Sequence, residues 1–194
     1  MQRIGIAGGI GSGKTATTER LTKLGWPVVD ADVAARAVTE PDRPAWLALC
    51  DAFGTSLLRE DRSLDRGRLA EIVFHDVTSL KRLNHITHNA IKVEILQQLD
   101  SMNEAVAFVA LPLFRPEHRD VFDLDEVWSV QVRPETALAR LVSFRSFSEE
   151  DARARLTQQM SNEERGSIVD RIIWNEGSID DLYVQVDELV REWS

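Results

Sequence analysis

The chain has 194 residues, with 23 Lys and Arg against 32 Asp and Glu, which gives a formal net charge of −9. This length suits one domain with a small inserted subdomain, and the acidic balance excludes a general nucleic-acid binder, which would carry a basic excess. The single cysteine, Cys50, excludes an intrachain disulfide framework and any Cys-x-x-Cys site.

The chain carries no signal-peptide pattern and no apolar run near the roughly 20 residues that span a bilayer. We therefore expect a cytoplasmic protein with neither a membrane nor a nucleic acid as partner.

In the first third of the chain, short apolar runs alternate with helical patterns, which is typical of a parallel α/β sheet. We predict strands at residues 3–7 and 27–30 and helices at 14–23, 32–39 and 43–53. The polar stretch 54–66 is predicted to be a surface loop.

A long helix is predicted over residues 76–99. Its proposed buried face has apolar spacing of three and four and comprises Val77, Leu80, Asn84, His88, Ile91, Ile95 and Leu99. On this face His88 fits either a core histidine or a ligand contact.

The remaining chain predicts three more strands and two clear helices, at 105–111, 127–132 and 171–174 and at 136–143 and 179–193. Two Ser-x-x-acid sequences, at 148–151 and 161–164, predict short helices in an excursion from the sheet. We expect one domain over residues 1–194 with a mobile subdomain near 144–166.

The sequence from Gly8 to Thr15 matches G-x-x-x-x-G-K-[ST] between a predicted strand and a predicted helix. Its glycines allow backbone N–H groups to point inward at phosphate oxygens, and the helix start adds positive potential. Lys14 supplies a point charge for the terminal phosphates, and the Thr15 hydroxyl is a ligand for Mg²⁺. The loop predicts a nucleoside triphosphate site.

Two sequence features of other nucleotide-binding proteins are absent, which narrows the class of reaction. The apolar strand 105–111 contains no acid of the kind found in motor ATPases and GTPases, and no Asn-Lys-x-Asp sequence for guanine is present. What remains is a small phosphotransferase of the nucleoside- or nucleotide-kinase type.

Two carboxylates follow the second predicted strand, at the sheet edge where ligands bind in open parallel sheets. Asp32 is predicted to accept the proton of a hydroxyl that attacks the γ-phosphate. For Asp30, a strand-end or N-cap role is the alternative.

The arginines near residue 150 fall into two groups. Arg153 and Arg155 each follow an acid by four positions, so both have local helix partners. Arg140 and Arg145 have no acid at that offset and are predicted to meet triphosphate charge, which suits a guanidinium.

A set of motifs occurs in one order along the chain: Gly8–Thr15, Asp30-Ala31-Asp32, Ala34-Ala35-Arg36, Phe53-Gly54, Leu64-Asp65-Arg66, Leu69, Phe74, His88, Leu111-Pro112-Leu113, Arg140-Leu141, Gln159, Glu164-Arg165, Asn175 and Gly177-Ser178. With this set the chain resembles the dephospho-CoA kinase family, from about residue 3 to 190. The phosphate loop alone is shared by many families, whereas the Asp-Ala-Asp and the later elements are more specific.

The resemblance implies ATP-dependent phosphorylation of the ribose 3′-hydroxyl of dephospho-CoA, the last step of coenzyme A synthesis. It implies a three-layer α/β P-loop kinase fold with a five-stranded parallel sheet of order 2-3-1-4-5. A helical region over about 32–100 would hold the acceptor, and a lid over about 144–166 would close over ATP.

The resemblance also implies roles for single residues. The ATP phosphates would contact Gly11, Ser12, Gly13, Lys14, Thr15 and Ala16. Asp32 would be the base, and Arg140 would approach the phosphates from the base of the lid. Arg66 and His88 fall in acceptor-side elements, although a helix-start surface charge is the alternative for Arg66. The turn that begins at Asn175 would lie near adenine.

The chain departs from the family pattern in four places. Phe144 stands where a second lid arginine is common, with Arg145 one position later, and Asn89 stands where a proline is usual. The glutamate that the family has after Pro112-Leu113 is displaced, because residues 114–116 intervene before Glu117, and Trp174 stands where an aspartate is usual. Two other functions therefore stay open: a small-molecule kinase with a changed acceptor, and a nucleotide-binding protein without turnover.

Overall fold

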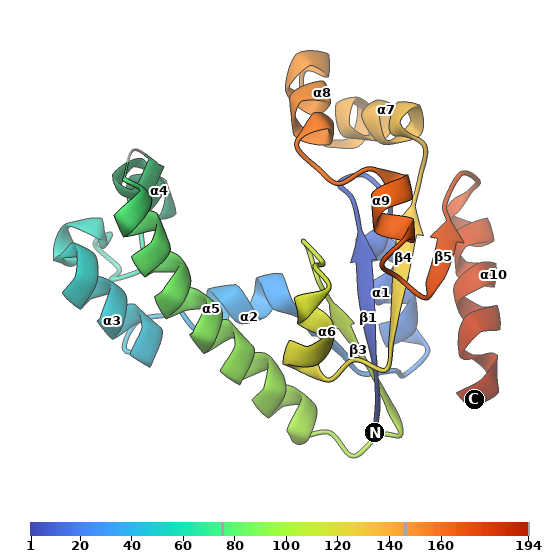
Figure 1. Ribbon diagram of the computed structural model, residues 1–194, viewed down its shortest axis with the longest axis horizontal. Helices are drawn as coiled ribbons and strands as arrows, with labels where there is room; N and C mark the ends of the chain where they lie inside the picture. The colour runs from blue at the N-terminus through green and yellow to red at the C-terminus, as the bar shows by residue number, and fades with distance from the viewer. Residues whose placement is uncertain (75, 146, 194) are drawn as a thin grey trace. The chain divides into compact units, whose positions relative to one another are not determined.

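The computed structural model describes residues 1–74, 76–145 and 147–193, and the side chain of Arg145 lies outside this description (Figure 1). The chain forms two compact units, one of Met1–Asp30 with Met102–Ser194 and one of Ala31–Ser101. The second unit spans nearly the same residues as the predicted acceptor region. No helix among the described residues is long and apolar enough to cross a membrane.

The first unit is built on a parallel sheet with an inserted series of helices. Its strands are β1 (Gln2–Gly8), β2 (Val28–Asp30), β3 (Val106–Ala110), β4 (Glu126–Gln131) and β5 (Arg171–Trp174). Its helices are α1 (Lys14–Lys23), α6 (Glu117–Phe122), α7 (Pro134–Arg145), α8 (Glu149–Thr157), α9 (Asn162–Gly166), α10 (Ile179–Val190) and a 3₁₀ turn, η2 (Arg191–Trp193).

The sheet has the order β2-β3-β1-β4-β5, and all of its pairs are parallel. This confirms the predicted fold class and strand order. Ile4 of β1 pairs with Phe108 on one side and with Glu126 on the other. The carboxyl ends of β2, β3, β1 and β4 therefore share one edge, where β1 opens into the glycine-rich loop (Figure 1).

Alternate side chains of the strands form the core of this unit. The face toward α1 and α10 is made of Ile4, Ile6, Val106, Phe108, Trp128, Val130 and Ile173, which pack on Leu21, Leu182, Val186 and Val190. On the opposite face, Gln131 Nε2 donates to the backbone oxygen of Asn162 over 3.2 Å. Helix α9 therefore covers that face, and the unit has three layers.

Helix α10 begins with the predicted N-cap at Ser178. The Ser178 hydroxyl accepts from the Asp181 N–H over 3.2 Å, and Asp181 Oδ2 accepts from the Ser178 N–H over 2.8 Å. The same reciprocal capping box starts α9 at Ser161. Both predicted helix starts are confirmed.

Replacing Ser178 with Ala is expected to lower the free energy of unfolding by about 1 kcal/mol, because α10 loses its side-chain cap. In a chain of this size that corresponds to a fall in Tm of roughly 2–4 °C. A thermal melt measures it, with Ser56→Ala as a control at an exposed serine of the second unit. Equal melting temperatures for Ser178→Ala and the parent would contradict the stabilising role of the cap.

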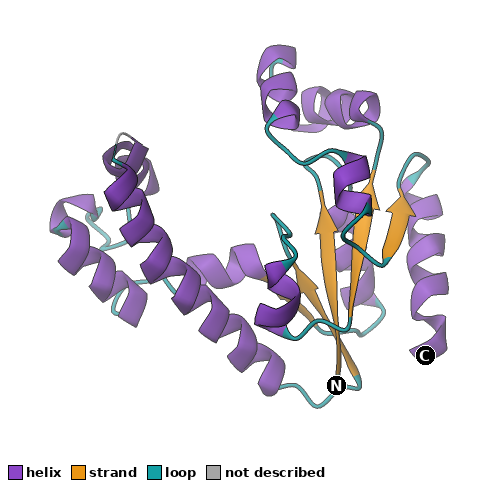
Figure 2. Cartoon of the chain, viewed as in Figure 1, coloured by secondary structure: helices purple, strands orange, loops and turns teal. Residues whose placement is uncertain are grey.

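The second unit is built from helices (Figure 2). They are α2 (Ala31–Ala37), α3 (Pro44–Phe53), a 3₁₀ turn η1 (Thr55–Leu57), α4 (Arg66–Phe74) and α5 (Val77–Asp100). Helix α5 packs against α2, α3 and α4. Their core contains Trp46, Leu49, Leu57, Leu64, Leu69 and Val73, with Leu83 and Ile86 of α5 packed against it.

Two sequence predictions were wrong in this unit. The segment 54–66 is not simply a surface loop, because Leu57 and Leu64 are buried and an antiparallel bridge joins Leu58 to Leu64. The buried face of the long helix is also misplaced in its first half, where Val77 is 68% exposed and Leu80 41% exposed. The same helix has a second row of apolar residues, through Leu83 and Ile86, and this row packs against the core of α3 and α4.

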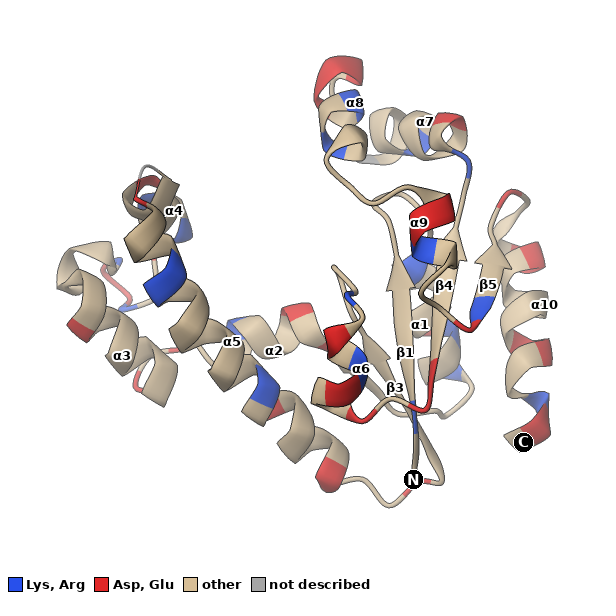
Figure 3. Cartoon of the chain, in the orientation of Figure 1, with Lys and Arg blue, Asp and Glu red and all other residues tan. Residues whose placement is uncertain are grey.

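Acidic and basic positions are interspersed along the helices, with acidic residues gathered at the start of α8 (Figure 3). Negative charge at a helix start is favourable because it meets the positive end of the backbone dipole.

Candidate active site

The predicted phosphate loop connects β1 to α1 through two glycines in the left-handed region. Gly11 has φ of 76° and Gly13, the N-cap of α1, has φ of 99°. Residues with a Cβ rarely adopt this conformation. The Ser12 N–H donates to the Gly9 oxygen over 3.2 Å, and the Thr17 N–H donates to the Gly13 oxygen over 3.0 Å. The loop therefore curls directly into the first turn of α1.

Asn175, which follows β5, supports this loop from the side. Its Nδ2 donates to the Ser12 oxygen over 2.7 Å, and the residue is 6% exposed. A Cβ on Gly13 would overlap that side-chain amide. Gly13 is therefore required both by its backbone angle and by the approach of Asn175.

Replacing Gly13 with Ala is expected to weaken ATP binding at least ~10-fold, since the loop must open to relieve the overlap with Asn175. The left-handed angle alone costs roughly 1–2 kcal/mol. Gly25→Ala is the matched control, because Gly25 has φ of 90° but no atom within 4 Å of its added Cβ. Calorimetric ATP titration should separate the two variants. Similar ATP affinities in both would contradict the steric argument.

Arg140 reaches the same loop from α7. Its Nη2 donates to the Asn175 oxygen over 2.9 Å, and its Nη1 donates to the Gly11 oxygen over 3.4 Å. In the described part of the chain this guanidinium forms no ion pair with a carboxylate. A half-buried cation at a phosphate loop is suited to bind oxyanions.

Glu176 fixes the start of α7. It accepts hydrogen bonds from the Arg133 N–H and, over 2.9 Å, from the Thr136 hydroxyl. The pKa of the Glu176 carboxyl is lowered, first by the backbone hydrogen bond from Arg133 and then by the Thr136 hydroxyl and nearby positive charge. The two hydrogen bonds of this carboxylate hold the start of the helix that carries Arg140.

The hydroxyl groups of the loop fit a nucleotide with its metal ion. Ser12 is 2% exposed, and its Oγ has no hydrogen-bond partner among the described residues. A buried unpaired hydroxyl is costly, and a phosphate oxygen would satisfy it. Thr15 lies in the first turn of α1 and is exposed, so its hydroxyl suits a metal ligand. Ala16 also lies in the first turn of α1, where backbone N–H groups have no partner within the helix, so its N–H suits a phosphate oxygen.

The predicted base follows directly from the sheet. β2 ends at Asp30, which pairs with Ala110 of β3, and Ala110 also pairs with Ile6 of β1. α2 begins at the next residue and carries the exposed Asp32 in its first turn. Asp32 therefore follows the last residue of β2 by two positions, and its role as the base stays a prediction.

A family model described as dephospho-CoA kinase matches residues 2–181. The chain belongs to the dephospho-CoA kinase family. A dephospho-CoA kinase of Bacillus cereus is 37% identical over 195 residues, which cover 98% of this chain and 96% of that protein.

Two solved structures share the fold of this chain over its whole length. The structure of TT1252 from Thermus thermophilus has a TM-score of 0.82 and 27% identity, covering 100% of this chain and 98% of that one. Dephospho-CoA kinase from Campylobacter jejuni has a TM-score of 0.67 and 29% identity, covering 100% and 97%. The resemblance predicted from sequence is confirmed, and so is the P-loop kinase fold.

The two residues predicted on the acceptor side of this dephospho-CoA kinase family member lie in the second unit. Arg66 is the first residue of α4, and its Nη2 donates to the Thr39 hydroxyl over 2.8 Å. His88 is exposed on α5, so its interpretation as a core histidine is wrong. Their roles in acceptor binding stay predictions.

Sequence reasoning did not assign two side chains that lie at the loop. Gln159 Oε1 accepts from the Ile10 N–H over 2.9 Å, and the Arg165 guanidinium lies beside Gly9. The only signal for either was its place among the motifs shared with dephospho-CoA kinases. In the first unit, therefore, the structure brings Arg140, Asn175, Gln159 and Arg165 together around the loop.

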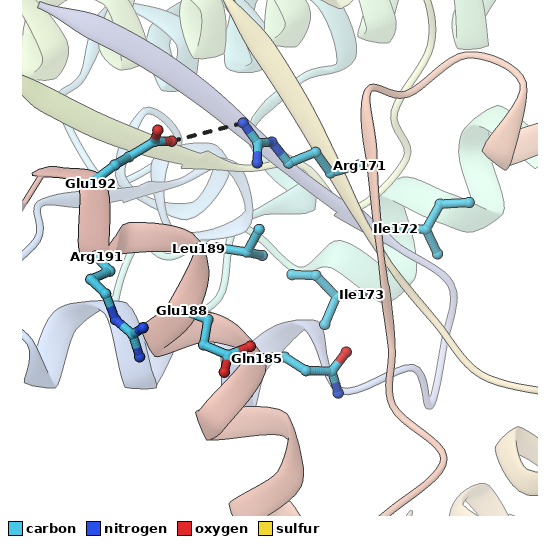
Figure 4. Close-up of a pocket in the computed structure, with 8 residues that line it drawn as sticks. All are labelled: Arg171, Ile172, Ile173, Gln185, Glu188, Leu189, Arg191 and Glu192. Atoms are coloured by element: carbon cyan, nitrogen blue, oxygen red, sulfur yellow. Dashed lines mark ion pairs between the residues drawn. The ribbon is translucent and has the colours of Figure 1, made fainter.

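A cavity of about 510 Å³ lies between β5 and α10. It is lined by Arg171, Ile172, Ile173, Gln185, Glu188, Leu189, Arg191 and Glu192 (Figure 4), and none of these is a predicted site residue. Its charges are partly paired, since Arg171 Nε lies 2.8 Å from Glu126 Oε2 and Arg171 Nη2 lies 3.8 Å from Glu192 Oε1.

Proposed function

We propose that this chain transfers the γ-phosphoryl group of ATP to the ribose 3′-hydroxyl of dephospho-CoA, giving coenzyme A and ADP. The observation that carries the proposal is the braced phosphate loop, with Gly11 and Gly13 left-handed and Arg140 and Asn175 bound to its carbonyls, in a member of the dephospho-CoA kinase family. Such a loop is built to hold a polyphosphate before chemistry begins.

The loop would bind the triphosphate through its backbone. The N–H groups from Gly11 to Ala16 would serve the phosphates at the start of α1, where the helix dipole favours negative charge. Lys14, the first residue of α1, adds a point charge for the terminal phosphates. Arg140 would donate its remaining N–H groups to oxygens that gain charge as the phosphoryl group leaves.

Mg²⁺ would be held by the Thr15 hydroxyl together with phosphate oxygens and water. When bound, it would neutralise part of the phosphate charge.

Asp32 would act as the general base. Its carboxylate accepts the proton of the 3′-hydroxyl as that oxygen attacks phosphorus. Support comes from its place in the first turn of α2, two residues beyond β2, at the strand edge where ligands bind in open parallel sheets. Arg66 and His88 would contact the acceptor from α4 and α5.

Asn175 would serve the nucleotide chiefly by holding the Ser12 carbonyl, since its side-chain amide is engaged there. The segment 144–166 would act as a lid over ATP, with Arg145 as a further phosphate contact. The bond from the Ile10 N–H to Gln159 links this segment to the loop. We propose a cytoplasmic protein whose partner is the small-molecule substrate.

A coupled assay of ADP release with dephospho-CoA and Mg-ATP tests the proposal. Turnover with dephospho-CoA, and phosphorus at the 3′ position of the product, is the expected result. Turnover only with another acceptor would support a kinase of changed specificity. Tight ATP binding with no turnover on any acceptor would support a nucleotide-binding protein that has lost activity.

A further inference from the structure

The side chain of Arg165 lies against the first turn of the phosphate loop. A Cβ built on Gly9 would lie 3.3 Å from Arg165 Nη2 and 3.6 Å from Nη1. Both terminal nitrogens of the guanidinium therefore face the loop. A side chain at position 9 would crowd the guanidinium, which the glycine allows to approach.

The partners of Arg165 are neutral. Nη2 donates to the Met160 oxygen over 2.8 Å, and Nη1 donates to Asn162 Oδ1 over 3.2 Å. Other arginines of this unit have carboxylate partners, as Arg20 has Asp187 and Arg119 has Asp170. In the described part of the chain Arg165 forms no ion pair.

Arg165 is also partly withdrawn from water. Burial lowers the pKa of its guanidinium from the ordinary value, and the nearby charge of Glu164 raises it. Desolvation of a cation that forms no ion pair is unfavourable. An anion that binds at the loop would remove this cost.

We propose that Arg165 is a phosphate-binding arginine in addition to Arg140 and Arg145, and that it donates to the terminal phosphate oxygens of ATP beside Gly9 while Arg140 serves the loop at Gly11. This assignment rests on the proposed function and adds a residue to its site. An anionic oxygen is the acceptor that a guanidinium with N–H groups to spare recognises best.

Gln159 lies beside Gly9 as well, and its neutral side chain leaves the positive charge of Arg165 uncompensated there. Its Oε1 would lie 3.0 Å from the same Cβ on Gly9 and accepts from the Ile10 N–H. The amide is a neutral acceptor, so it orients the loop without cancelling the charge of Arg165. A glutamate at position 159 would keep the hydrogen bond and place a counter-charge there.

The alternative role for Arg165 is structural, because its two hydrogen bonds tie the start of α9 to the segment before it. The two roles differ in how the affinity loss depends on the phosphates of the ligand. A phosphate contact affects ATP most, ADP less and adenosine not at all. A structural contact affects all three alike.

The experiment compares the dissociation constants of ATP, ADP and adenosine for Arg165→Met, Arg165→Lys and the parent, by calorimetry without acceptor. We expect at least ~10-fold weaker ATP binding for Arg165→Met, unchanged adenosine binding, and partial recovery in Arg165→Lys. Arg191→Met is the control, since Arg191 lines the cavity of Figure 4. ATP affinity within twofold of the parent, or an equal loss for all three ligands, would overturn the assignment.

Gln159→Glu decides the matter if Arg165→Met does not fold. It should weaken ATP binding several-fold, more at low ionic strength where charge is less screened, and leave adenosine binding unchanged. Parent-like ATP affinity in Gln159→Glu would overturn the proposal. Absence of turnover of dephospho-CoA by the parent would reject the proposed function, while the binding series would still test Arg165.

Discussion

Lys14→Ala is expected to abolish detectable turnover of dephospho-CoA. Lys14 is the first residue of α1 and follows the left-handed Gly13 directly. No other residue from Gly8 to Thr15 is basic. Loss of a single preorganised group that stabilises transition-state charge costs on the order of 10²–10³-fold in rate, and loss of the loop lysine also weakens the grip on ATP. Initial rates of ADP release over a range of ATP concentrations measure both effects.

Lys23→Ala is the matched control for this prediction, because Lys23 lies at the other end of α1 and is exposed. It should turn over at the parent rate. A Lys14→Ala enzyme that keeps more than about a tenth of the parent kcat at saturating ATP, well short of such a loss, would remove Lys14 from the transition state.

Asp32→Asn is expected to lower kcat at least ~10²-fold, the low end of general-base effects, while ATP affinity is unchanged. The amide keeps the shape of the side chain but cannot take the proton of the attacking hydroxyl. Stopped-time assays for kcat and calorimetry for ATP binding give the two quantities separately, and a circular dichroism spectrum checks the fold.

Two further variants serve as controls for Asp32→Asn. Asp51→Asn removes an exposed carboxylate of α3 and should leave the rate unchanged. Asp30→Asn tests whether the residue at the end of β2 has only a strand-end role, in which case its kcat stays near the parent value. Near-normal turnover in Asp32→Asn would show that another group accepts the proton.

The sheet could be predicted because its strands carry a signal of their own. Val106–Ala110 is continuously apolar and buried along its whole length, which is the pattern of a central parallel strand. The strand order, in contrast, came from the family resemblance. Helix α4 was missed because its buried apolar residues, Leu69 and Val73, are too few to give a clear helical period, although Asp65 Oδ1 accepts from the Arg68 N–H over 3.0 Å at the helix start.

The long helix α5 shows why periodicity has limits. Its sequence contains one apolar line through Val77 and Leu80 and another through Leu83 and Ile86, and both have helical spacing. Only the second meets the core of the other helices. The choice depends on tertiary partners, and no local pattern encodes them.

The residues of the candidate site also differ in how far the sequence could predict them. The phosphate loop is contiguous in sequence, so its motif predicted the phosphate-binding residues directly. Gln159 and Arg165 reach it from about 150 positions further along the chain, and neither has a spacing rule that points to Gly9. Glu176 likewise holds the start of α7, the helix that carries Arg140, from 40 or more positions further along the chain.

The phosphate loop is held by hydrogen bonds within the protein, from Arg140, Asn175 and Gln159 to its backbone. These bonds need no ligand. The conformational entropy of ordering that backbone is therefore lost when the protein folds, and little of it is lost when ATP arrives. The phosphate loop itself should therefore need no slow rearrangement, and the first phase of association should have a rate that rises linearly with ATP concentration, with closure of the segment 144–166 as a later phase.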